Sequence, residues 1–190
     1  MTAGLVRYHA SRQSHFVTFS CYRRSPKLHD PRCCDIFLAT LEAMRIRFNL
    51  RIYGYVLMPE HVHLLLSEPK KRTLADAIHF LKLSSSKKIG FLNPRLAPNS
   101  AARTWGTGST ARTWDTRDKE PFWQKRYYDR NVRDDREFSV KLRYLHRNPV
   151  KRGLCLAPED WPWSSFRHYA SGEIGVVEIE SQWTAKIIPG

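Results

Sequence analysis

The stretch RIYGYVLMPEHVHLLLS, residues Arg51–Ser67, decides the fold of this chain. It contains two runs rich in β-branched, aromatic and aliphatic residues, Arg51–Met58 and His61–Ser67, and this composition is typical of β-strands. Only Pro59 and Glu60 separate the two runs. So short a break predicts that they are neighbouring antiparallel strands.

The chain on either side of this pair alternates between strand-like and helix-like patterns. Aromatic and β-branched residues predict strands over His15–Tyr22 and Phe122–Val132. Apolar residues at helical spacing predict helices over Asp35–Phe48, Thr73–Ile89 and Asp134–Asn148. The predicted order is therefore strand, helix, strand, strand, helix, strand, helix.

Polar residues and a proline mark the ends of two of these helices. Thr73, with Asp76 three residues later, predicts a capped start, and Pro149 is expected to stop the third helix. The order of elements resembles the ferredoxin-like split β-α-β arrangement. We therefore expect an α+β fold, an antiparallel sheet with helices on one face, followed by the third helix. We assign residues 1–152 to one domain and residues 153–190 to a C-terminal tail.

The composition changes between Asn93 and Glu120, where Ser, Thr, Gly, Arg and Asn dominate. This segment contains a near-repeat, ARTWGT at residues 102–107 and ARTWDT at residues 111–116. Such a composition predicts an inserted loop rather than part of the core. Its Arg and Trp residues could stack on bases, but flexible linkage is the more frequent role of such segments.

The chain carries a large positive charge. It has 32 Lys and Arg against 18 Asp and Glu, a formal net charge of +14 and a pI of about 10.0. Such an excess favours a polyanionic partner, and nucleic acid is the simplest one. The alternative is a basic solvated surface. A membrane-surface role fits less well, because no long amphipathic helix with a basic face is predicted.

The cysteines predict neither a zinc site nor a disulfide framework. Cys21, Cys33, Cys34 and Cys155 include no C-x-x-C pair, and two of them are adjacent. The N-terminus has no apolar stretch of signal-peptide length. We therefore expect reduced thiols in a cytoplasmic protein that does not associate with membranes.

Two histidines on the second strand of the central pair are candidate metal ligands. Because successive side chains of a strand point to opposite faces, His61 and His63 project from the same face, expected to be exposed, with Val62 behind them. The two imidazoles can then share one ion. Unrelated surface histidines are the plain alternative, and a histidine-triad hydrolase would require another histidine at the position of Leu65.

A tyrosine and an asparagine on the third helix could meet these histidines. Tyr144 and Asn148 are four residues apart, so they lie on one helix face and allow a nucleophile and a metal ligand to converge. The alternative is a core-packed tyrosine followed by a helix-ending asparagine. Tyr127 and Tyr128 are rival nucleophiles, but on a strand neither has an obvious ligand partner one helical turn away.

Four motifs occur in a fixed order along the chain: MPEHVHLLL at residues 58–66, FWQKRYYD at 122–129, YLHRNPVKRGL at 144–154 and WPWSSF at 161–166. Together they resemble the REP-associated tyrosine transposases. These belong to the HUH superfamily of single-tyrosine transposases and are similar to insertion-sequence-200-type transposases. The resemblance runs from about Tyr8 to Tyr169 and leaves the Asn93–Glu120 insertion without a counterpart in the family pattern.

The resemblance implies a function and a set of site residues. It implies that His61 and His63 bind Mg²⁺ or Mn²⁺, that Asn148 supplies a further ligand and that Tyr144 is the nucleophile. The expected activity is cleavage and transfer of single-stranded DNA beside hairpins of REP-like elements, through a 5′-phosphotyrosine. Trp163 lies in a tail motif of this branch.

The expected partner is single-stranded DNA that carries hairpins. The residues predicted to contact it are Lys125, Arg126, Arg130, Arg143, Arg147, Lys151, Arg152 and Trp163. We expect a bacterial protein that is a monomer or a homodimer and that associates with the nucleoid. The competing hypothesis is a catalytically silent protein that binds DNA or RNA hairpins. A metal hydrolase of small molecules would leave the basic third helix unexplained.

Overall fold

A computed structural model describes residues 14–92 and 120–182. The described strands form one four-stranded sheet in the order β2-β3-β1-β4, and every neighbouring pair is antiparallel. Their bounds are β1 Ser14–Ser20, β2 Ile52–Met58, β3 His61–Ser67 and β4 Tyr128–Val132. The expected α+β class is confirmed, and so is the antiparallel pairing of the two central strands.

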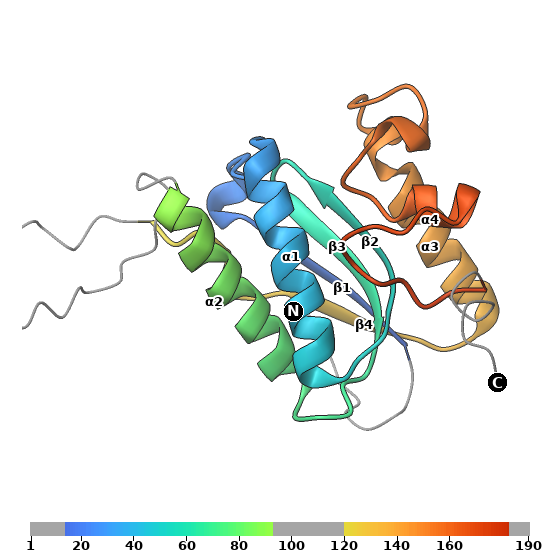
Figure 1. The fold of residues 1–190 in the computed structure, drawn as a ribbon, viewed down its shortest axis with the longest axis horizontal. Helices are drawn as coiled ribbons and strands as arrows, with labels where there is room; N and C mark the ends of the chain where they lie inside the picture. Colours follow the sequence, from blue (N-terminus) through green and yellow to red (C-terminus); the bar gives the residue numbers. More distant parts are fainter. Residues whose placement is uncertain (1–13, 93–119, 183–190) are drawn as a thin grey trace, which may run out of the picture.

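Helices cover both faces of the sheet. Figure 1 shows α1 and α2 packed side by side on one face, with α3 and the short α4 on the other. Their bounds are α1 Pro31–Phe48, α2 Leu74–Leu92, α3 Asp135–Lys151 and α4 Phe166–Ser171, with 3-10 turns at Tyr22–Arg24 and Pro158–Asp160. Among these helices none is long and apolar enough to cross a membrane.

The alternation of side chains along β1 divides the core into two clusters. Val17 and Phe19 belong to the larger cluster, which α1 and α2 cover. Phe16 belongs to the smaller cluster, which includes Leu145 of α3. Because both faces are covered, β3 is apolar at successive positions, as strands buried on both faces are.

The sequence prediction of one long strand over Phe122–Val132 is wrong. The regular strand β4 covers only Tyr128–Val132. The residues before it also pair with the chain of β1, through a bridge between Cys21 and Trp123, but in a different register.

The change of register creates a bulge. On one side of it Thr18 pairs with Tyr128, and on the other side the Gln124 amide donates to the Ser20 carbonyl at 2.9 Å. Residues 125–127 therefore lie opposite a single residue of β1. Extra residues of this kind bend a strand and redirect its side chains. We call this segment the 125–127 bulge.

The predicted helix ends are partly right. Thr73 and Asp76 form the expected capping box, with the Asp76 amide donating to Thr73 Oγ1 at 3.1 Å and the Thr73 amide to Asp76 Oδ2 at 3.2 Å. Pro149, however, does not stop α3, which continues to Lys151. A proline removes only its own amide, and the next turn is still closed because the Arg152 amide donates to the Asn148 carbonyl at 3.0 Å.

The chain after α3 packs along the outer strand β2. The Leu57 amide donates to the Trp163 carbonyl at 2.9 Å, and the Glu180 amide donates to the Ile52 carbonyl at 2.8 Å. The described residues 153–182 thus cover an edge of the sheet that would otherwise be open to pairing with another chain. Two predicted segments lie outside the described residues. They are the insertion, of which only Glu120 is described, and the end of the C-terminal tail after residue 182.

A buried polar network joins α3 to β2 and to this C-terminal segment. His146 Nε2 lies 2.9 Å from Ser165 Oγ, which accepts the Tyr55 amide at 3.0 Å. Helix α3 comes close to Gly54, where a Cβ would lie 2.7 Å from a methyl of Leu142 and the Leu142 side chain would have to shift. Burial lowers the pKa of His146 from 6.5 to about 4.

This network should make folding stability depend on pH. In the unfolded chain His146 takes up a proton below about pH 6.5, whereas in the folded chain it does so only below about pH 4. The contribution of the neutral His146 to stability is therefore fully present above pH 6.5 and is lost as the pH falls toward 4. Between pH 7.5 and pH 5 the free energy of unfolding should fall in both proteins, but in His146→Gln it should fall less than in wild type, by on the order of 1–2 kcal/mol. Urea unfolding at both pH values measures this, and equal losses would contradict it.

Candidate active site

The two predicted histidine ligands lie together at the start of β3. His61 Nε2 and His63 Nε2 are 3.0 Å apart. Both residues are buried, at 6% and 5% exposure, so the expectation of an exposed strand face is wrong. The reason is that β3 is an inner strand and α3 packs over this face.

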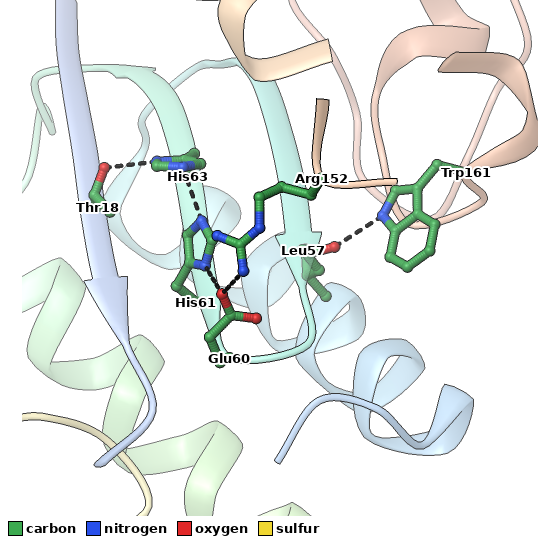
Figure 2. A network of polar contacts seen from close by, with 7 residues as sticks. All are labelled: Thr18, Leu57, Glu60, His61, His63, Arg152 and Trp161. Atoms are coloured by element: carbon green, nitrogen blue, oxygen red, sulfur yellow. Dashed lines mark hydrogen bonds and ion pairs between the residues drawn. The ribbon is translucent and has the colours of Figure 1, made fainter. Parts of the chain in front are cut away.

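The other ring nitrogen of each histidine is held by the protein. His61 Nδ1 lies 3.1 Å from Glu60 Oε1, and His63 Nδ1 lies 2.7 Å from Thr18 Oγ1 (Figure 2). When His61 Nδ1 carries the proton, it donates a hydrogen bond to the carboxylate, which leaves Nε2 with a free lone pair. The hydroxyl of Thr18 can serve either tautomer of His63, because it both donates and accepts.

Arg152 connects the end of α3 to this group. Its Nη2 donates to Glu60 Oε1 at 2.8 Å, the same oxygen that accepts from His61 (Figure 2). A carboxylate that is itself held by a cation keeps its position and orients the imidazole beyond it. Arg152, predicted from the sequence to contact DNA, therefore has at least one intramolecular role.

Both histidines are neutral at neutral pH. Burial lowers the pKa of His63 to about 3, and the charges of His61 and Lys141 add to the effect. Burial also lowers the pKa of His61, against the opposing effect of Glu60. Neutral imidazoles can act as metal ligands, whereas protonated ones cannot.

Tyr144 reaches the histidines from α3. Its ring centroid lies 5.4 Å from that of His63 and 6.0 Å from that of Phe16, in edge-on contacts. The residue is 42% exposed, so it is not the core-packed tyrosine of the alternative interpretation. The Lys151 ammonium lies 6.0 Å from the ring centroid, which places positive charge beside it.

Asn148 lies on the same face of α3 as Tyr144 and Arg152, one helical turn from each. Tyr144 contacts His63 and Arg152 contacts Glu60, so the face between them is directed at the histidine pair. Asn148 is buried, and its side chain makes no hydrogen bond to another residue in the described part of the chain. Its amide oxygen is therefore available as a ligand.

The rival tyrosines lie farther from the histidines. Tyr128 pairs with Thr18, which in turn pairs with His63, so one strand separates the tyrosine from the histidine. Tyr127 is partly buried against the core cluster that α1 and α2 cover. Of these tyrosines, Tyr144 is the one whose ring contacts a histidine of the pair.

The predicted DNA-contacting residues fall into three groups. Lys125 and Arg126 are exposed on the 125–127 bulge. Exposed basic residues also line α3 and β4, namely Arg130, Arg143, Arg147, Lys151 and Arg152, although Arg130 is paired with Glu137 at 2.8 Å. Trp163 is not brought to this site, because it packs against the larger core cluster and Trp161.

Two members of the site were missed from the sequence. Glu60 was interpreted only as part of the break between two strands, although its place next to His61 is a usable signal. Thr18 carries no sequence signal, because only the register of β1 against β3 places it opposite His63.

The arrangement fits a divalent cation. The Nε2 atoms of His61 and His63 are separated by 3.0 Å. No group of three His, Cys, Asp or Glu side chains suited to a metal occurs in residues 14–92 and 120–182.

Comparison with known proteins identifies the class. Residues 9–121, more than half of the chain, match the family model described as "Transposase IS200 like". The chain therefore belongs to the IS200-like transposase family, as the paired histidines suggest. Within that family it is one of the REP-associated tyrosine transposases, to which the following relatives belong.

Two relatives and one solved structure illustrate the similarity. A putative REP-associated tyrosine transposase of Haemophilus influenzae is 28% identical over 119 residues, which cover 62% of this chain and 60% of that protein. The REP-associated tyrosine transposase of Escherichia coli is 34% identical over 161 residues, 84% of this chain and 80% of that one. A solved REP-associated tyrosine transposase bound to a REP hairpin shares the fold, with a TM-score of 0.66 over 95% of this chain and 93% of that chain, at 18% identity.

Proposed function

We propose that this transposase cuts and transfers single-stranded DNA beside hairpins, with Tyr144 as the nucleophile. The observation that carries the proposal is the contact between the partly exposed Tyr144 ring and the buried, neutral histidine pair. A buried polar pair beside a partly exposed tyrosine is a costly arrangement in a small fold, and a ligand-binding role explains it.

The reaction is a transesterification at phosphorus. The phenolic oxygen of Tyr144 bonds to the phosphorus while the bond to the 3′-oxygen breaks. The phenolic proton leaves to water, and the departing 3′-oxygen takes up a proton. The products are a 5′-phosphotyrosine and a free 3′-hydroxyl, which conserve the bond energy for rejoining, so no nucleotide cofactor is needed.

A tyrosine hydroxyl with a pKa of about 10 is a weak nucleophile at neutral pH and needs an activated phosphate. His61, His63 and Asn148 would hold Mg²⁺ or Mn²⁺. Such an ion would polarise a non-bridging phosphate oxygen. Thr18 and Glu60 keep the two imidazoles in position, and Lys151 adds positive charge next to Tyr144.

The partner would be hairpin-bearing DNA in a bacterial nucleoid. The net charge of +14 and the exposed basic residues of α3 and the 125–127 bulge support this. The solved relative is bound to a REP hairpin, which supports the same class of partner here.

A catalytically silent hairpin-binding protein would keep these charges but would have no use for a neutral histidine pair under a tyrosine. Metal-dependent cleavage of a single strand, but not of the same sequence in full duplex, separates the two.

The proposed function makes three predictions, and the first of them concerns the metal. In His61→Ala/His63→Ala we expect Mn²⁺ affinity to fall by about a hundredfold or more, because two neutral nitrogen ligands are lost. Isothermal titration with Mn²⁺ measures this, with circular dichroism to check the fold because both residues are buried. His79→Ala, which removes an exposed histidine of α2, is the matched control. Wild-type cleavage rates in the double variant would show that the metal assignment is wrong.

The second prediction concerns Glu60. Glu60→Gln keeps the shape of the side chain but removes the charge that holds His61 and Arg152, so Mn²⁺ affinity should fall roughly tenfold. The exposed Glu159→Gln changes the net charge equally and should leave the affinity unchanged. Equal affinities of the two variants would mean that Glu60 does not position His61.

The third prediction concerns the covalent intermediate. Tyr144→Phe removes one hydroxyl, so the fold and Mn²⁺ binding should persist while cleavage and the protein–DNA adduct disappear. A hairpin oligonucleotide labelled at its 3′ end should leave its label on denatured wild-type protein, Tyr127→Phe and Tyr128→Phe, but not on Tyr144→Phe. An adduct that survives in Tyr144→Phe and is lost in a neighbour would move the nucleophile to β4 or the bulge.

A further inference from the structure

A groove with a volume of about 680 Å³ adjoins the candidate active site. One wall is the end of β1, and the other wall is the chain that leads through the 125–127 bulge into β4. Its lining residues include Thr18, Ser20, Arg24, Lys125, Arg126 and Tyr128. Thr18 belongs to both sites, because its hydroxyl bonds to His63. Thr18 therefore links the groove to the histidine pair.

The ring of Tyr128 lies at the β4 side of this groove. Tyr128 pairs with Thr18, and directly paired residues of antiparallel strands point to the same face of a sheet. The Tyr128 side chain is consequently on the face that carries His63. The residue is 46% exposed, although an aromatic ring on a covered sheet face would ordinarily be buried. An exposed ring beside a nucleic-acid site is a platform on which a base can stack.

Arg24 supplies positive charge to the groove that it lines. Arg24 is exposed, and it forms no ion pair with a carboxylate in the described part of the chain. The neighbouring Arg23, by contrast, is paired with Glu120 at 2.6 Å.

The backbone at this point is held in an unfavourable conformation. Arg23 and Arg24 have φ angles of 52° and 53°, in the left-handed region that residues with a side chain rarely adopt. Strain of this kind persists where the surrounding structure enforces it, and it is concentrated at functional sites. Here the strained residues lie in the 3-10 turn after β1, which brings Arg24 to the groove.

We propose that this groove binds the unpaired nucleotide that adjoins the scissile phosphate, with its base stacked on Tyr128 and its phosphate bound by Arg24. The inference rests on the proposed function and specifies the form of its substrate. The groove volume of about 680 Å³ lies within the range of roughly 300–1,000 Å³ that is common for small-molecule sites. Aromatic rings combined with cations are the usual means of holding single-stranded nucleic acid. Lys125 and Arg126 would contact the next phosphates along the strand.

The test measures binding without metal or cleavage, so it does not depend on the proposed chemistry. All variants carry Tyr144→Phe, and fluorescence anisotropy is measured in buffer with a chelator. The ligands are a hairpin oligonucleotide with a single-stranded flank and the same hairpin without it. Tyr128→Ala should weaken binding of the flanked hairpin roughly fivefold to a hundredfold, the effect of removing one stacking ring, whereas Tyr128→Phe should bind normally. Binding of the bare hairpin should change in neither variant.

Arg24→Gln has a matched control in Arg72→Gln. Arg72 is also exposed and also has a left-handed φ, of 63°, but it follows the far end of β3. Arg24→Gln should weaken binding of the flanked hairpin and reduce the slope of log K against log salt by about one, the signature of one lost phosphate contact. Arg72→Gln should leave the flank-dependent part of binding unchanged.

The position of the base can be located by an abasic scan of the flank. In the protein whose only change is Tyr144→Phe, removing the base at one position of the flank should weaken binding. The same removal should have no further effect when Tyr128→Ala is also present, because the two changes delete one interaction. The proposal is overturned if Tyr128→Ala and Arg24→Gln bind the flanked hairpin as Arg72→Gln does. A wild-type protein that binds the flank as expected but cuts nothing in Mg²⁺ or Mn²⁺ would instead refute the proposed function alone.

Discussion

The antiparallel register of β1 and β3 sets Thr18 opposite His63 and Ser20 opposite His61. Side chains alternate between faces with a period of two, so a slip by one residue would turn both histidines toward α1 and α2. The apolar residues on the opposite face of each strand prevent such a slip, because it would bring them out of the larger core cluster. The packing of that core thus fixes the geometry of the polar site on the other side of the sheet.

Helix α3 completes the site and determines its electrostatics. Its packing on the sheet buries the histidines, which keeps them neutral, while Tyr144 at its margin stays partly open to solvent. The ion pair of Arg152 with Glu60 fastens the C-terminal end of the helix to the loop that precedes β3. One helix therefore carries the candidate nucleophile, a candidate ligand and a residue that orients one of the histidines.

The sequence by itself determined the elements whose pattern is local. Alternating and apolar runs on either side of Pro59-Glu60 predicted β2 and β3, and the structure has β3 at the expected His61–Ser67. The spacing of His61 and His63 predicted that they share a face, and the i to i+4 spacing of Tyr144 and Asn148 predicted the same on α3. These inferences succeed because strand and helix periods depend only on residues close in the chain.

Tertiary structure alone decided how these pieces meet. The alternation of side chains along a strand cannot show that a helix covers the histidine face, so the burial of His61 was not predicted. The end of α3 was also predicted too early, because a proline in the last helical turn does not end the helix. Thr18 joins His63 across 45 positions of sequence, and Arg152 joins Glu60 across 92. Such contacts follow from strand register, a two-residue shift at the bulge, and helix docking, which are settled by packing of the whole core rather than by any local pattern.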